Sequence, residues 1–160
     1  MSENNKIVII GIGNVLLMDE GIGIHVVDEL EKHKFPQNVT LYDGGTGGFK
    51  LIDLMDGANT VFFIDAVETG KPPGTIITFK SGDVRTNYRK KRYSLHDTDL
   101  LEVIKMVELL EFSPDIVIVG VQPKTINYGT TLSQELKDSI PDIINTVLKS
   151  VEKLCTVPSV

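Results

Sequence analysis

The chain is poor in cysteine and in aromatic residues. Its 160 residues include a single cysteine, Cys155, and 6% aromatic side chains. One cysteine cannot form an internal disulfide, which is typical of a protein from a reducing compartment. A chain of this length buries about 68–70% of its unfolded surface, so it needs neither a disulfide nor a structural metal to fold. We therefore expect one domain over residues 1–160, in which a bound metal would serve function.

Long apolar runs and an excess of positive charge are also absent. The apolar run Ile7–Ile12 is too short for a signal-peptide core or a membrane span, so we expect a cytoplasmic protein with no membrane partner. The formal net charge of −6 argues against a nucleic-acid partner. One basic segment departs from this balance, Arg85–Arg92. We interpret it as a solvated loop, with the steering of an acidic peptide partner as the alternative.

The motifs of the common peptidases are missing as well. There is no Gly-x-Ser-x-Gly elbow and no cysteine–histidine pair, and Asp97–Asp99 reads Asp-Thr-Asp where an aspartic protease has Asp-Thr-Gly. His25 and His33 do not belong to an HExxH zinc motif, and we expect both at the surface.

Short apolar runs and helical patterns alternate along the chain. This order predicts an α/β fold in a single domain, with a twisted, mainly parallel five-stranded sheet and helices on both faces. The expected strands cover residues 6–12, 39–42, 61–66, 75–79 and 116–121. The expected helices cover residues 21–34, 49–55, 98–111 and 132–154, with a break at Pro141 in the last one.

The first strand leads into the segment "GIGNVLLMDEGIG", which begins like half of a dinucleotide-binding fingerprint. Leu16 stands at the third glycine position, and Asp19 and Glu20 stand where a pyrophosphate would bind. Two like charges ~4 Å apart repel by roughly 4 kcal/mol at an effective dielectric constant of about 20. The acids therefore exclude a phosphate and favour a cation. We expect Asp19 to cap the helix that follows it.

Polar residues recur where the expected strands end. Because the carboxyl ends of parallel strands meet at one edge of a sheet, we expect these residues to converge. They are Asn14, Asp19 and Glu20 after the first strand, Asp43 and Thr46 after the second, Asp65 at the end of the third, His96 before a helix, and Gln122 after the last strand. Glu20, Asp65 and His96 form a candidate metal site of two oxygen ligands and one nitrogen ligand, with an open position for an incoming group.

Five ordered motifs together resemble the hydrogenase maturation endopeptidases, namely "GIGNVLLMDEGIG", "DGGTGG", "FFIDAV", "SLHDTDLLEVI" and "GVQPKTINYGTTLSQEL". The resemblance implies an enzyme that removes a C-terminal extension from the precursor of the large subunit of a nickel–iron hydrogenase, after nickel insertion. It also implies that Glu20, Asp65 and His96 recognise the nickel, and that Asp43 affects cleavage or recognition.

On this interpretation the catalytic residues are Asp43, Asp65 and Glu20, with Asp43 as the base that activates water. Nickel is supplied by the substrate, and cadmium or zinc would substitute for it in a crystal. We expect a monomer whose partner is the large-subunit precursor. Two alternatives remain open. One is a small metal-dependent amidase that acts on a free metabolite, and the other is a nickel-checkpoint or delivery protein that binds the precursor without cutting it.

Overall fold

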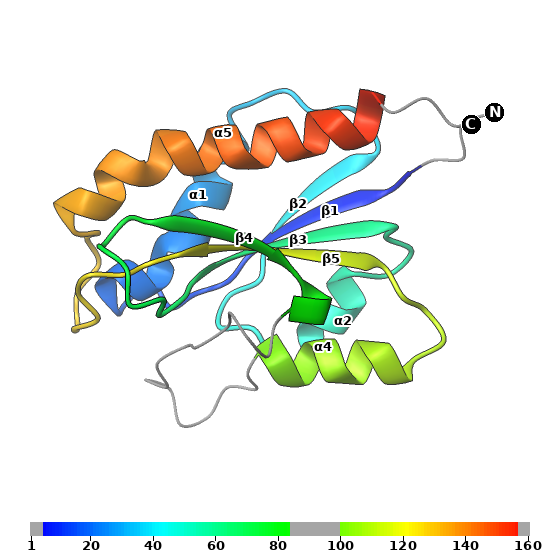
Figure 1. Cartoon of the computed structure of the whole chain (residues 1–160), viewed down its shortest axis with the longest axis horizontal. Helices are drawn as coiled ribbons and strands as arrows, with labels where there is room; N and C mark the ends of the chain where they lie inside the picture. The colour runs from blue at the N-terminus through cyan, green and yellow to red at the C-terminus, as the bar shows by residue number, and fades with distance from the viewer. Residues whose placement is uncertain (1–4, 84–99, 157–160) are drawn as a thin grey trace.

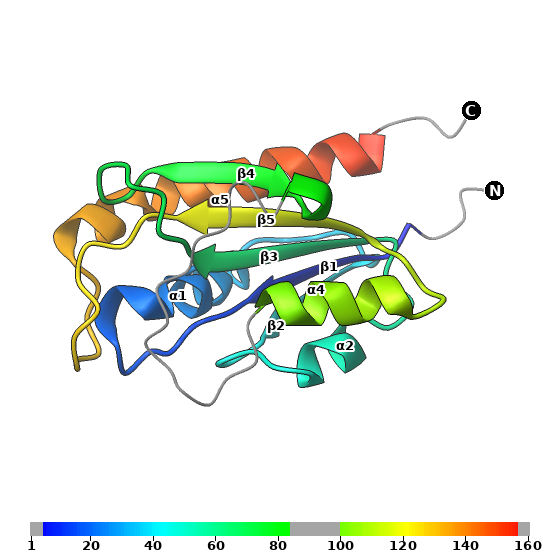
Figure 2. The ribbon, with the colours of Figure 1, turned by 60° about the horizontal axis from the view of Figure 1, so that its bottom comes forward.

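The computed structural model describes residues 5–83 and 100–156, and these residues form five strands in one sheet (Figure 1). The strand order is β2-β1-β3-β5-β4; β2, β1, β3 and β5 run parallel, and β4 pairs antiparallel to β5 (Figure 2). In chain order the elements are β1 (Ile7–Gly11), η1 (Met18–Gly21), α1 (Ile22–Leu30), β2 (Val39–Asp43), α2 (Lys50–Leu54), β3 (Thr60–Ala66), β4 (Ile76–Lys80), η2 (Ser81–Asp83), α4 (Leu100–Leu109), β5 (Asp115–Val121) and α5 (Gln134–Thr156). The predicted fold class is confirmed.

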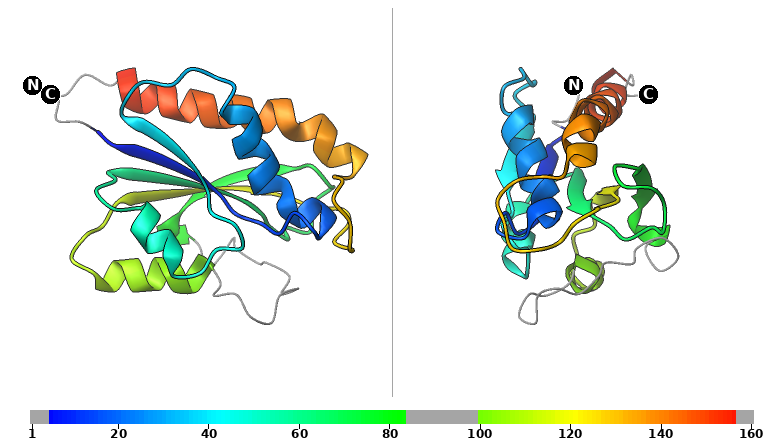
Figure 3. Two further views of the ribbon diagram at one scale, coloured as in Figure 1. Left: turned by 180° about the vertical axis from the view of Figure 1, so that it is seen from behind. Right: turned by 90° about the vertical axis from the view of Figure 1, so that its left-hand side faces the viewer.

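Helices cover both faces of the sheet, as Figure 3 shows. Every residue of β1 and β3 is buried, which explains why these strands read as continuous apolar runs. Side chains alternate between the faces along a strand, so Phe62 packs with α1 and α5 while Phe63 packs with α2 and α4. The same alternation places Asp65 on the face that α2 and α4 cover.

The predicted break at Pro141 is wrong, because α5 runs without interruption from Gln134 to Thr156. A proline inside a helix removes one backbone hydrogen bond and costs about 3 kcal/mol. Here Pro141 is exposed, and so is Lys137, whose carbonyl loses its partner and can be hydrated. The buried face of α5 includes Leu136 before the proline and Ile143 after it. Packing against the sheet outweighs the local penalty.

Glycines let α1 approach the sheet closely. A Cβ atom at Gly23, the second residue of α1, would lie 2.2 Å from the carbonyl oxygen of Ile64 and 2.4 Å from that of Ile12. A Cβ atom at Gly11 in β1 would lie 2.2 Å from the carbonyl oxygen of Gly23. All three distances are far below the 3.0 Å that real Cβ contacts keep. Gly11, the first glycine of the segment that resembles a nucleotide-binding loop, therefore serves the packing of a helix on a sheet.

Two expectations fall outside the described residues. These are the basic segment at residues 85–92 and the position of His96. Within the described ranges, no helix combines the length and the apolar character that a membrane span requires.

Candidate functional site

The loops after β1 and β2 are joined at the carboxyl edge of the sheet. The Gly44 amide donates to the Gly11 carbonyl, and the Gly13 amide donates to the Gly45 carbonyl, both at 2.8 Å. On the other side of β1, the Ile12 amide donates to the carbonyl of Ile64 in β3 at 2.9 Å. The segments that carry Glu20, Asp43 and Asp65 therefore meet at one edge, as the strand-end pattern predicted.

Three carboxylates are buried among the described residues, and all three lie at this edge. Asp19 and Asp65 have no exposed surface, and Glu20 is 8% exposed. Asp19 and Glu20 belong to η1, which lies against β3, and Asp65 is the next-to-last residue of β3. Burying a carboxylate is costly unless donors or a cation compensate the charge, so such a concentration indicates a functional edge.

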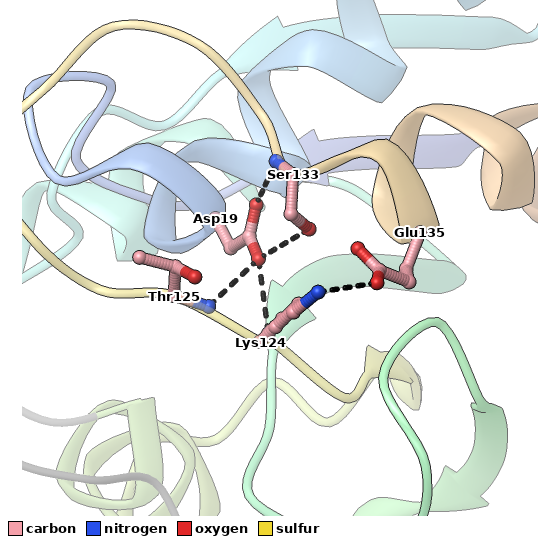
Figure 4. A network of polar contacts seen from close by, with 5 residues as sticks. All are labelled: Asp19, Lys124, Thr125, Ser133 and Glu135. Atoms are coloured by element: carbon pink, nitrogen blue, oxygen red, sulfur yellow. Dashed lines mark hydrogen bonds and ion pairs between the residues drawn. The ribbon is translucent and has the colours of Figure 1, made fainter.

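Asp19 is held by four hydrogen bonds from distant parts of the chain (Figure 4). Its Oδ2 atom accepts from the backbone amides of Lys124 and Thr125, at 2.9 and 3.0 Å, and from the Ser133 hydroxyl at 2.7 Å. Its Oδ1 atom accepts from the Ser133 amide at 2.7 Å. The carboxylate thus fixes η1 to the loop after β5 and to the residue before α5. We call this arrangement the Asp19 clamp.

The expectation that Asp19 caps the following helix is wrong. Leu17 is the N-cap residue of η1, Gly21 is that of α1, and neither cap has a side-chain hydrogen bond. The Asp19 carboxylate accepts instead from backbone amides that β5 and α5 bring to it. Beside the clamp, the ammonium of Lys124 hydrogen-bonds the carboxylate of Glu135 and lowers the pKa of Glu135 below its ordinary value.

Two of the three predicted metal ligands, Glu20 and Asp65, belong to elements that meet at this edge. Glu20 lies in η1 and Asp65 lies near the end of β3, and η1 lies against β3. Within residues 5–83 and 100–156, no group of three or more histidine, cysteine, aspartate or glutamate side chains could hold a metal ion. The third predicted ligand, His96, lies outside these ranges. It precedes Leu100, the first residue of α4, by four positions.

Asp43, the predicted base, ends β2 with its side chain exposed. Its Oδ1 atom accepts from the Gly45 amide at 2.7 Å, and Gly45 has a φ of +55°. This local bond shapes the glycine-rich turn. Asp43 therefore lies at the expected edge, and its side chain also stabilises the turn that follows β2.

Gln122 organises the loop that follows β3. Its Oε1 atom accepts from the amide and the hydroxyl of Thr69, at 2.6 and 2.7 Å, and its Nε2 atom donates to Glu68 and to the Pro123 carbonyl. The side chain is 5% exposed. Its polar atoms are thus used in fixing the segment just beyond Asp65.

The loops after β1 and β5 are also paired through their backbones. The Gly129 amide donates to the Leu16 carbonyl at 2.9 Å, and the Met18 amide donates to the Gly129 carbonyl at 3.0 Å. Leu17 and Gly129 form an isolated parallel bridge. We call residues 14–18 and 125–129 the loop pair. It presents three exposed apolar or aromatic side chains, Val15, Leu16 and Tyr128.

Sequence reasoning missed the Asp19 clamp and the orphaned atom of His25. The partners of Asp19 lie 105 to 114 positions away, and no local pattern signals such a contact. His33 is exposed as expected, whereas His25 is half-buried. The Nε2 atom of His25 is buried and has no hydrogen-bond partner in the structure described. The prediction of a surface residue is therefore wrong for His25.

This fold defines an α/β protein with three buried carboxylates at the ends of its parallel strands. The sequence model of the hydrogenase maturation protease family matches residues 24–150. The hydrogenase expression/formation protein HupD of Bradyrhizobium diazoefficiens is 35% identical over 147 residues, which cover 90% of this chain and 77% of that relative. The hydrogenase 2 maturation protease of Escherichia coli is 29% identical over 151 residues, which cover 92% of each chain.

Solved structures agree with these relatives. The hydrogenase maturating endopeptidase HybD from E. coli has a TM-score of 0.83 at 28% identity, and the match covers 92% of this chain and 93% of that one. The chain belongs to the hydrogenase maturation protease family, and it is a peptidase. The resemblance inferred from the five motifs is confirmed.

Proposed function

We propose that this peptidase removes the C-terminal extension from the precursor of the large subunit of a nickel–iron hydrogenase after nickel has been inserted. The observation that carries the proposal is the burial of Glu20 and Asp65 at the carboxyl edge, in a chain of this family. Carboxylate oxygens are ligands for divalent metal ions, so two carboxylates at a sheet edge suit the recognition of a metal ion.

Nickel belongs to the substrate in this proposal. The precursor carries it on its own thiolates, and Glu20, Asp65 and His96 contact it from the enzyme side. Two oxygens and one nitrogen leave coordination positions for the precursor's ligands. A precursor without nickel gives these residues no cation to bind. No metal contact then offsets the conformational entropy that is lost when the flexible tail of the precursor becomes ordered. Recognition of the metal therefore acts as a checkpoint before cleavage.

Cleavage follows from positioning. Contact with the nickel holds the nearby scissile peptide against the sheet edge, where the glycines after Asp43 let a peptide backbone approach closely. Asp43 takes a proton from a water molecule as the water attacks the peptide carbonyl carbon. The carbon–nitrogen bond then breaks, and the leaving amine receives the proton. Asp65 and Glu20 keep the substrate in register during these steps.

The test uses purified precursor in nickel-loaded and nickel-free forms, with cleavage read by mass spectrometry. We expect the wild-type chain to shorten only the nickel-loaded form. Asp65→Asn and Glu20→Gln, which keep the size of each side chain, should leave it uncut, and circular dichroism of each variant checks that it is folded. Equal cutting of both forms by the wild type, or normal cutting by both variants, contradicts the checkpoint.

The same assay separates the two alternative functions. An amidase would hydrolyse small amides in the absence of any precursor. A non-cleaving checkpoint protein would bind the nickel-loaded precursor and leave its mass unchanged.

A further inference from the structure

We propose that the loop pair, residues 14–18 and 125–129, is the surface on which the precursor docks beside its nickel centre. This inference rests on the proposed function, because the occupant is the same large-subunit precursor. It concerns binding to the folded body of the precursor rather than contact with its metal.

The loop pair carries three of the seven large hydrophobic side chains that are exposed among the described residues. Leu16 is 60% exposed, Tyr128 is 93% exposed and Val15 is 39% exposed. Contiguous segments around them, Asn14–Met18 and Thr125–Leu132, contain no charged side chain, in a chain of which 24% of the residues are charged. Aromatic and large aliphatic side chains without neighbouring charges are the composition of an interface centre.

The backbone of the loop pair is already ordered. Besides the two bonds between Leu16, Met18 and Gly129, the Asn14 side chain accepts from the Leu16 amide at 2.9 Å, and the Asp19 amide donates to the Thr125 carbonyl at 3.1 Å. The Asp19 clamp holds the base of both loops. A surface that is ordered before binding loses less conformational entropy when a partner arrives.

The position of the loop pair selects its occupant. Leu16 precedes Glu20 by four residues on the same loop, and the two loops lie side by side at the left end of the molecule in Figure 2. We therefore expect a protein whose metal reaches Glu20 to place the surface around that metal near Leu16. The absence of charge predicts that this surface of the precursor is apolar or uncharged.

The experiment compares Leu16→Glu and Tyr128→Glu with a matched control, Leu109→Glu. Leu109 is 81% exposed and ends α4, on the chain leading into β5 at the opposite edge of the sheet. The probe is the nickel-loaded large-subunit precursor from the same genome. Its dissociation constant is measured on immobilised enzyme, and its mass is followed in a separate reaction. Leu16→Ala and Tyr128→Ala provide milder versions of the same changes.

We expect Leu16→Glu and Tyr128→Glu to raise the dissociation constant and KM by about tenfold or more, because an interface centre tolerates a buried charge poorly. The kcat at saturating precursor should stay within about twofold of the wild type, and Leu109→Glu should bind normally. Unchanged binding by the two variants, with normal cutting by the wild type, overturns the docking surface and leaves the proposed function intact.

Two further outcomes separate the hypotheses. If the wild type binds the precursor without shortening it and Leu16→Glu still weakens binding, the docking surface stands and the proposed function fails. If the wild type sediments as a dimer and Leu16→Glu as a monomer, the loop pair is an interface between copies of this chain, and the docking proposal is overturned.

Discussion

Asp19 and Glu20 are neighbours in the sequence, but the fold gives them different surroundings. The carboxylate of Asp19 accepts hydrogen bonds from three backbone amides and one hydroxyl. Glu20 is the next residue of the same 3-10 helix, at the edge of the sheet. Their adjacency means that the clamp on one residue sets the position of the other. A carboxylate that serves structure thus supports the carboxylate to which we assign recognition of the metal.

The clamp predicts a large effect for a small substitution. Asp19→Asn replaces one carboxylate oxygen with an NH₂ group, which donates hydrogen bonds and does not accept them. At least one of the buried backbone N–H groups around it therefore loses its acceptor. We expect a loss of about 3 kcal/mol in the free energy of unfolding, since hydrogen bonds to charged groups contribute about 1.5–3 kcal/mol each. Urea unfolding measures the change. Glu135→Gln, which alters only the exposed pair with Lys124, is the control and should change stability little. Similar midpoints for the two variants would contradict the clamp.

Asp43 allows its structural and chemical roles to be separated. An asparagine side chain at this position would still accept from the Gly45 amide through its Oδ1 atom, so Asp43→Asn keeps the turn and removes the base. We expect cleavage to slow by about 10²–10⁴-fold, the usual contribution of a general base. Binding of the nickel-loaded precursor should be unchanged. Single-turnover rates measure the first quantity and titration the second. A normal cleavage rate would reduce Asp43 to a turn residue.

At the scale of elements, the contact between α1 and the sheet leaves no room for a side chain. Gly23→Ala improves helix propensity by about 1 kcal/mol but forces a Cβ atom against two carbonyl oxygens. We expect a net loss of about 1–3 kcal/mol, the usual cost of overpacking. Gly82→Ala is a matched control, because a Cβ atom there would have no neighbour within 4 Å. Thermal unfolding of the two variants decides. Equal melting temperatures would show that α1 can shift away from the sheet at little cost.

The elements themselves were largely predictable from sequence, and their errors have physical causes. The fully buried strands β1 and β3 gave clear apolar runs, since a strand covered on both faces has no polar alternation. Pro141 was misjudged because local propensity ignores the tertiary packing of the stripe that contains Ile143. The end of α1 was placed four residues too late, at Lys34 instead of Leu30, because the polar residues that follow carry no clear stop signal.

The candidate site was predictable only where strand ends mark it. Glu20, Asp43 and Asp65 follow from the rule that ligands bind beyond the carboxyl ends of parallel strands. The Asp19 clamp did not follow from any rule, because its donors are backbone amides whose positions depend on how the loop after β5 folds. The loop pair was hidden for the same reason. Exposure of Leu16 and Tyr128 is a property of the folded chain.

Charge acts at the scale of the whole molecule. The net charge of −6 disfavours the approach of an acidic partner, and the basic segment at residues 85–92 is the exception. If that segment steers the precursor, reversing Arg89, Lys90 and Lys91 to glutamate should slow association and flatten its dependence on salt. Stopped-flow association at several ionic strengths measures both effects. An unchanged rate at low salt would mean that the segment is only a solvated loop.

The Asp19 clamp also dictates when the enzyme becomes competent. Its partners lie 105, 106 and 114 residues further along the chain, so the edge that carries Glu20 cannot close until Ser133 has left the ribosome. Contacts of such sequence separation form late, because the entropy of closing the intervening loop must be overcome first. We therefore expect incomplete translation products to have no organised cleavage site. A peptidase built in this way is silent during most of its own synthesis.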